Sequence, residues 1–102
     1  MPEGFRIEQF EKYEGDDWWN WAVWIEAPDE ALDLIDFVEW TLHPTFPSPV
    51  RKVRDRGRKF RLKTGGWGVF RIFARVQMKS GSETKLHHDL KLHYPNRTAA
   101  TA

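Results

Sequence analysis

Apolar and polar residues alternate along most of this chain, and a period of two predicts β-strands. The first alternating segment, residues 5–13, is half apolar with acids on its outer face, and Gly15-Asp16-Asp17 then predicts a turn. The second segment, residues 18–25, is apolar on both faces, which is typical of a strand in the centre of a sheet. A third segment over residues 38–42 leads into a proline-rich stretch.

The second half of the chain continues the same pattern. Residues 50–53 and 60–62 predict two short basic strands, and residues 70–78 carry the longest apolar face before a final alternating segment over residues 86–93. Residues 30–36 fit either one helical turn or a crossover loop. Seven or eight short strands separated by turn residues predict an all-β fold, an antiparallel β-sandwich.

Length and composition predict a single domain. A chain of 102 residues can bury a core without disulfide or metal support, and this chain has no cysteine, so a cytoplasmic location is the default. The N-terminal segment is acidic and predicts no signal peptide, and no stretch approaches the ~20 apolar residues of a membrane helix. We expect the domain to span residues 1–95 and the small polar tail, residues 96–102, to be disordered.

Charge is distributed very unevenly along the chain. Residues 1–39 hold twelve of the fifteen acids, whereas residues 51–63 hold eight bases and one acid. A basic run can form a surface for nucleic acid or another acidic partner. It can also protect the exposed edges of strands against aggregation. We favour the second interpretation, because the acidic half of the same domain would oppose binding to a polyanion.

Two loop segments place large aromatic residues where turns are expected. Residues 42–47 are stiffened by prolines, and residues 65–70 contain three glycines that are predicted to allow positive φ and close backbone approach. Phe46 and Trp67 are therefore expected to be exposed on turns, which suggests binding more than core packing. The alternative is that both rings only close the end of the sandwich.

A slot between two aromatic rings would suit a flat neutral group. The planar amide of an acylated lysine can stack between such faces, while a hydroxyl and a backbone N–H satisfy its polar atoms. A cage for methyl-lysine is the nearest competitor, since aromatic faces attract cations. No acid flanks Phe46 or Trp67 and the intervening segment is basic, so the sequence favours a neutral ligand.

Several motifs follow one another in a characteristic order. They are Trp21-x-Val23-x-Ile25, Leu42-His43-Pro44-Thr45-Phe46-Pro47-x-Pro49, then Phe60, Gly66-Trp67-Gly68-x-Phe70 and His88-Asp89-Leu90-Lys91-Leu92. Their order and approximate spacing resemble the YEATS domain family over about residues 18–92, and the small size is most similar to its prokaryotic branch. The resemblance implies an immunoglobulin-like sandwich whose end loops bind acylated lysine, with acetyl or longer, often unsaturated groups such as crotonyl.

The resemblance also implies roles for particular residues. Phe46 and Trp67 match the aromatics that sandwich the acyl amide, and the Trp67 backbone N–H matches the donor to the acyl oxygen. Thr45 matches the hydroxyl residue that hydrogen-bonds the amide, and His43 matches the histidine that supports that hydroxyl.

The remaining family positions concern space and flanking contacts. Gly66 and Gly68 match glycines that leave room for the ligand, and Asp89 matches an acid that, in some members, holds a basic residue beside the modified lysine. Trp18 lies near the position of the family's first-loop aromatic. Trp19 replaces a common histidine and Val69 replaces a common acid, which weakens the case for a histone-like partner.

Other function classes are less well supported. A protein-interaction module that uses its sheets, with a vestigial or repurposed pocket, stays open, as does nucleic-acid binding through residues 51–63. No nucleophile motif, phosphate loop or catalytic carboxylate pair is present, so we expect neither an enzyme nor a cofactor. His87 and His93 lie too far apart along one strand to share a metal ion with Asp89.

Overall fold

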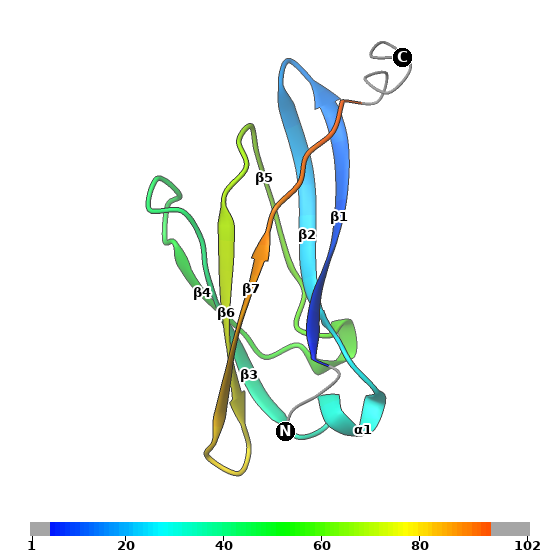
Figure 1. Ribbon diagram of the computed structural model, residues 1–102, viewed down its shortest axis with the longest axis vertical. Coiled ribbons are helices and arrows are strands. Elements are labelled where there is room, and N and C mark those ends of the chain that lie inside the picture. Colours follow the sequence, from blue (N-terminus) through cyan, green and yellow to red (C-terminus); the bar gives the residue numbers. More distant parts are fainter. Residues whose placement is uncertain (1–4, 95–102) are drawn as a thin grey trace.

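Two antiparallel sheets pack face to face in the computed structural model, which describes residues 5–94 (Figure 1). The sheet orders are β1-β2-β5 and β4-β3-β6-β7, so the all-β sandwich predicted from the sequence is confirmed, with seven strands. The predicted tail, residues 96–102, lies outside the described residues. The elements are β1 (Arg6–Gly15), β2 (Trp18–Glu26), α1 (Asp29–Leu32), β3 (Ile35–Thr41), β4 (Val50–Val53), β5 (Leu62–Gly66), β6 (Arg71–Met78) and β7 (Glu83–Asp89).

The first hairpin follows directly from its turn residues. Asp16 and Asp17 connect β1 to β2 with φ values of 54° and 58°. A two-residue connection with both φ values positive matches the twist of paired strands, and aspartate tolerates this conformation better than most residues. β2 then lies between β1 and β5, as its apolar faces predicted. Within residues 5–94, no helix is long and apolar enough to cross a membrane.

The core between the sheets is dominated by large aromatic side chains. Trp21, Trp40 and Phe60 are among the fully buried residues. The Trp40 indole N–H donates to the Phe60 carbonyl at 3.0 Å and thereby fixes the connection between β4 and β5. Phe60 has a φ of 59°, so the predicted strand over residues 60–62 is wrong at its start and β5 begins only at Leu62.

One open side of the sandwich is closed by a glutamine. The Gln9 side-chain amide donates to the Lys91 carbonyl at 2.6 Å, and its oxygen accepts the Lys91 N–H at 3.0 Å. The same oxygen accepts from His88 Nε2 at 2.7 Å. These bonds hold the segment after β7 beside β1.

We expect His88 to make the fold less stable in acid. Burial lowers the pKa of His88, so the unfolded chain binds a proton more readily than the folded one. The contribution of neutral His88 to the free energy of unfolding is therefore fully present above the ordinary histidine pKa of about 6.5. It decreases as the pH drops below that value. In urea titrations between pH 7 and pH 5, His88→Gln should lose less stability than the wild type.

The neighbouring exposed histidine provides the matched control for this measurement. His87→Gln removes a side chain of the same type from the outer face of β7 and should keep the wild-type fall between pH 7 and pH 5. Equal pH profiles for His88→Gln and the wild type would show that the prediction is wrong.

The acidic and basic halves of the chain meet as ion pairs. Arg54 contacts Asp36 at 3.0 Å, and Arg56 contacts Asp33 at 2.8 Å. Lys59 contacts Glu26 at 3.3 Å. The basic strands β4 and β5 both lie at sheet edges, as the edge-protection interpretation predicted.

Candidate functional site

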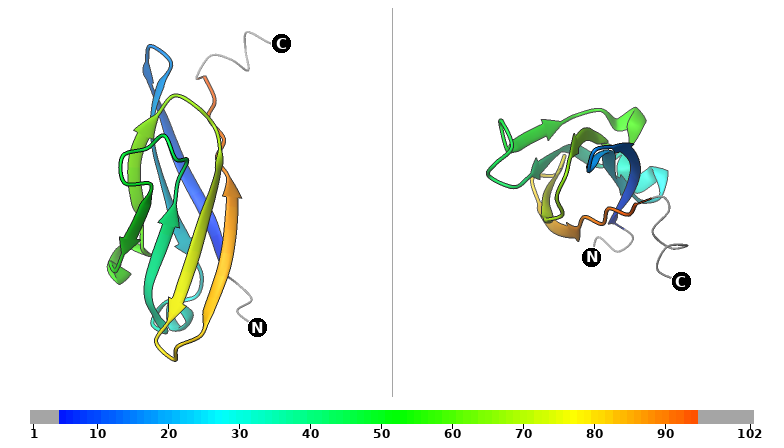
Figure 2. Two further views of the ribbon diagram at one scale, coloured as in Figure 1. Left: turned by 90° about the vertical axis from the view of Figure 1, so that its left-hand side faces the viewer. Right: turned by 90° about the horizontal axis from the view of Figure 1, so that it is seen from above.

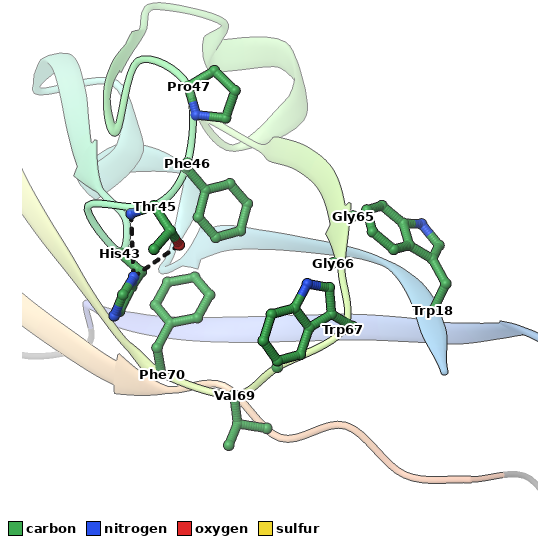
Figure 3. Close-up of a pocket in the computed structure, with 11 residues that line it drawn as sticks. Trp18, His43, Thr45, Phe46, Pro47, Gly65, Gly66, Trp67, Val69 and Phe70 are labelled. Atoms are coloured by element: carbon green, nitrogen blue, oxygen red, sulfur yellow. Dashed lines mark hydrogen bonds between the residues drawn. The ribbon is translucent and has the colours of Figure 1, made fainter. Parts of the chain in front are cut away.

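A cleft of about 370 Å³ opens at one end of the sandwich, and its size is within the usual range for small-ligand sites. Figure 2 shows the β3–β4 and β5–β6 connections at the same end, beside the β1–β2 hairpin. The β3–β4 and β5–β6 connections supply most of the lining, and Trp18 contributes from the start of β2 (Figure 3). The lining residues are Trp18, His43, Thr45, Phe46, Pro47, Gly65, Gly66, Trp67, Gly68, Val69 and Phe70.

The loop between β3 and β4 is held in shape by its own backbone. The Leu42 N–H donates to the Pro49 carbonyl at 2.8 Å and closes the base of the loop. The Phe46 N–H donates to the His43 carbonyl at 3.0 Å and forms a turn within it. Prolines before and after Phe46 restrict the chain further, so the aromatic ring is presented from a stiff support.

Arg51, the second residue of β4, stabilises the same loop. Its guanidinium donates to the Ser48 carbonyl at 3.1 Å and to the Pro47 carbonyl at 3.0 Å. The guanidinium carbon lies 5.9 Å from the centre of the Phe46 ring. In the sequence Arg51 belongs to the basic run, and no local signal distinguishes it from the other seven bases there.

His43 orients the hydroxyl of Thr45. The Thr45 backbone N–H donates to His43 Nδ1 at 3.2 Å, so this nitrogen is assigned as an acceptor with the ring proton on Nε2. Thr45 Oγ1 lies 2.9 Å from the same nitrogen and therefore donates its proton to it. The free lone pairs of Oγ1 can accept an N–H from a ligand in the cleft, and Figure 3 draws both contacts.

The two predicted aromatic walls differ in burial. Trp67 is 73% exposed, whereas Phe46 is half-buried and not exposed as the sequence suggested. Phe46 rests on the rings of Trp21 and Phe70, with centroid distances of 6.3 and 5.3 Å. In Figure 3 the Phe46 and Trp67 rings come from different loops and border the same space. One wall is thus packed against the core and the other is largely exposed to solvent.

The glycines act through close packing and not through unusual backbone angles. Within residues 5–94, positive φ occurs among glycines only at Gly15 and Gly81, so the prediction for Gly65, Gly66 and Gly68 is wrong. Gly65 and Gly66 belong to β5 and not to the turn. A Cβ at Gly65 would lie 2.9 Å from Trp18 Nε1 and 3.0 Å from the Trp19 carbonyl, so a side chain there would clash.

Seven of the eight site residues predicted from the sequence line this cleft, and Asp89 does not. Asp89 lies on β7, where Arg71 Nε contacts its carboxylate at 2.8 Å, and this hydrogen bond lowers the pKa of Asp89. The prediction did not include Gly65, Pro47, Val69 and Phe70, although each lies within two positions of a predicted residue in the sequence.

The cleft offers no ionised partner for a cation. Its lining contains no carboxylate, and His43 is its only titratable side chain. Among residues 5–94, no three histidine, cysteine, aspartate or glutamate side chains come together as a metal site. The site is therefore suited to a small, flat and neutral group that needs a hydrogen-bond acceptor on one side.

Fold and site together define an immunoglobulin-like domain with an aromatic cleft between its end loops. The chain matches the prokaryotic YEATS domain family over residues 19–91. It belongs to that family, as the resemblance in its motifs predicted.

Curated relatives and solved structures are consistent with this assignment. The AF-9 homolog proteins of Candida glabrata and Saccharomyces cerevisiae are 32% and 31% identical to the chain over 78 residues. Each alignment covers 72% of this chain and 34% of the relative, so the chain spans about a third of their length.

Two solved Yaf9 structures show the same fold. The Yaf9 YEATS domain bound to H3K27ac has a TM-score of 0.67 at 22% identity, covering 91% of this chain and 72% of that one. The Yaf9 YEATS domain recognizing an H3K122suc peptide has a TM-score of 0.66 at 24% identity, covering 87% and 70%. These likenesses confirm the immunoglobulin-like sandwich.

Proposed function

We propose that this domain is a non-catalytic reader that binds an acylated lysine, such as acetyl-lysine or crotonyl-lysine, on a protein or peptide. The observation that carries the proposal is a cleft bordered by Phe46 and Trp67, with the Thr45 hydroxyl already oriented by His43. Membership of the YEATS family and the acylated histone H3 peptides named for the Yaf9 structures support it.

The chemistry of the cleft matches an acyl amide group by group. The flat amide stacks between the two rings, and each aromatic face contributes about 0.5–1.5 kcal/mol beyond area burial. The amide N–H donates to Thr45 Oγ1, whose own proton is directed to His43. The acyl oxygen accepts the Trp67 backbone N–H, so both polar atoms are satisfied when water leaves.

Unmodified lysine should be excluded by the same features. Its ammonium group would lose hydration and meet no carboxylate in the cleft lining. Nucleic-acid binding through residues 51–63 is not favoured, because several of these bases already pair with acids of the first half of the chain. The structure offers no comparable argument for a second function.

A peptide titration tests the proposal. Isothermal titration calorimetry should give micromolar affinity for peptides carrying acetyl-lysine or crotonyl-lysine, because a small slot seldom supplies more than about 8 kcal/mol. The same peptide with unmodified lysine should not bind. Equal binding of the modified and unmodified peptides would overturn the proposal.

Thr45→Val should weaken acetyl-lysine binding by about tenfold or more. Valine keeps the shape of threonine but leaves the buried amide N–H without an acceptor, which costs about 1–3 kcal/mol. Thr45→Ser is the matched control, since it retains the hydroxyl and should stay within about threefold of the wild-type affinity. If Thr45→Val binds like Thr45→Ser, the hydroxyl does not contact the ligand.

A further inference from the structure

A buried hydrogen-bond donor next to the cleft finds no acceptor among residues 5–94. Trp21 on β2 is 1% exposed, and its indole N–H is the buried side-chain polar group left unpaired in this part of the chain. The other two core tryptophans show the usual arrangement. Trp19 donates to the His93 carbonyl and Trp40 to the Phe60 carbonyl, each at 3.0 Å. An unpaired buried donor is rare in native proteins and indicates an acceptor from elsewhere.

The Trp21 indole lies directly against the wall of the cleft. Its ring packs edge-on against Phe46 at 6.3 Å and Phe70 at 5.9 Å, and both of these residues line the cleft. Trp21 therefore lies in the part of the core that adjoins the cleft, in contact with two of its lining residues.

Gly66 lies next to both the cleft and the indole N–H. Gly66 is a buried lining residue, and a Cβ built on it would lie 3.6 Å from Phe46 Cζ and 3.9 Å from Trp21 Nε1. A side chain at this position would therefore contact both Phe46, which lines the cleft, and the unpaired indole N–H of Trp21. Any side chain at this position would separate the two.

We propose that the Trp21 indole N–H is the inner hydrogen-bond donor of the slot and is reached through the space at Gly66. The inference rests on the proposed function and specifies its ligand class. The slot should prefer acyl groups that carry a neutral oxygen in the chain, such as a hydroxyl, over hydrocarbon acyl groups of the same length.

The neutral form of the oxygen follows from the surroundings. A hydrocarbon chain leaves the indole N–H unpaired, whereas a hydroxyl oxygen accepts it. A carboxylate would also accept the N–H, but no lysine or arginine lines the cleft, so burial of its charge would be uncompensated. The preferred group is therefore polar and uncharged.

Peptides with matched four-carbon acyl groups test this preference. Wild-type protein should bind a 3-hydroxybutyryl-lysine peptide about three- to tenfold more tightly than the butyryl-lysine peptide, as one added hydrogen bond predicts. Gly66→Ala should abolish this difference, because its methyl group fills the space in front of the N–H. Its contacts of 3.6 and 3.9 Å are ordinary van der Waals distances, so the variant should fold.

Gly68→Ala is the matched control variant. Gly68 also lines the cleft, but a Cβ there meets no atom within 4 Å, so the preference for the hydroxyl should persist. The measured quantity is the ratio of the two four-carbon affinities within each variant, so a change in overall acyl-lysine affinity does not affect the comparison.

A spectroscopic readout follows the donor itself. The indole N–H signal of Trp21, assigned by its loss in Trp21→Phe, should shift downfield with the hydroxybutyryl peptide and not with the butyryl peptide. The affinity comparison does not depend on that variant folding.

The outcomes separate this inference from the proposed function. If acetyl-lysine binds but wild-type protein does not distinguish the two four-carbon groups, or if Gly66→Ala keeps the preference, the inference is overturned and the reader function stands. If none of the acylated peptides binds, both are overturned.

Discussion

Trp67→Ala is expected to weaken acetyl-lysine binding by about 30- to 100-fold, which corresponds to about 2–3 kcal/mol. The substitution removes one of the two aromatic walls while keeping the backbone N–H that is proposed to bind the acyl oxygen. Trp67 is 73% exposed, so its loss should change the unfolding temperature little. Calorimetric titration and thermal unfolding of the same preparation measure the two effects separately.

An exposed aromatic residue away from the cleft gives the control. Phe10 is 57% exposed on β1 and does not line the cleft, so Phe10→Ala should bind acetyl-lysine as the wild type does. Unchanged affinity in Trp67→Ala would mean that the ligand does not stack on this ring. A large loss in both variants would indicate a general effect on the fold.

Trp40→Ala is expected to lower the free energy of unfolding by about 3–5 kcal/mol. Trp40 is fully buried between the sheets, and its removal creates a large cavity. It also leaves the Phe60 carbonyl without the indole donor that now lies 3.0 Å away. Urea denaturation followed by far-ultraviolet circular dichroism measures the loss, which is a large part of the 5–15 kcal/mol typical of small domains.

Trp24→Ala controls for the loss of a tryptophan in general. Trp24 is half-buried on β2, where its ring lies under Arg61 at 4.9 Å and its N–H contacts Glu26. Truncation of a half-buried side chain leaves no enclosed cavity, so the free energy of unfolding should fall by about 1 kcal/mol or less. Similar losses in the two variants would show that Trp40 has no special place in the core.

Local patterns were sufficient to predict most of the strands. The alternation in residues 70–78 indicated which face is buried, and the apolar residues 18–25 indicated a central strand. Gly15-Asp16-Asp17 predicted the first turn, where Asp16 and Asp17 adopt positive φ. The start of β5 was not predictable in this way. Phe60 looks like a strand residue, yet its left-handed conformation depends on burial and on the bond from Trp40.

The candidate site also combines residues that short motifs predict with contacts that only the fold creates. His43, Thr45, Phe46 and Trp67 lie within short motifs, so their positions on two loops could be predicted from the sequence. The support from Arg51 and the unpaired N–H of Trp21 could not, because both depend on which groups the fold brings together. Sequence spacing carries no information on whether a buried donor finds an acceptor.

The ion pairs between the two halves of the chain have a kinetic consequence. With a net charge of +1 and most acids close to bases, the domain exerts little long-range attraction on a charged peptide. Association should then proceed at the unsteered rate of about 10⁵–10⁷ M⁻¹s⁻¹ for any peptide that reaches the cleft. An acylated and an unacylated peptide would collide with the domain equally often, and only their residence times would differ.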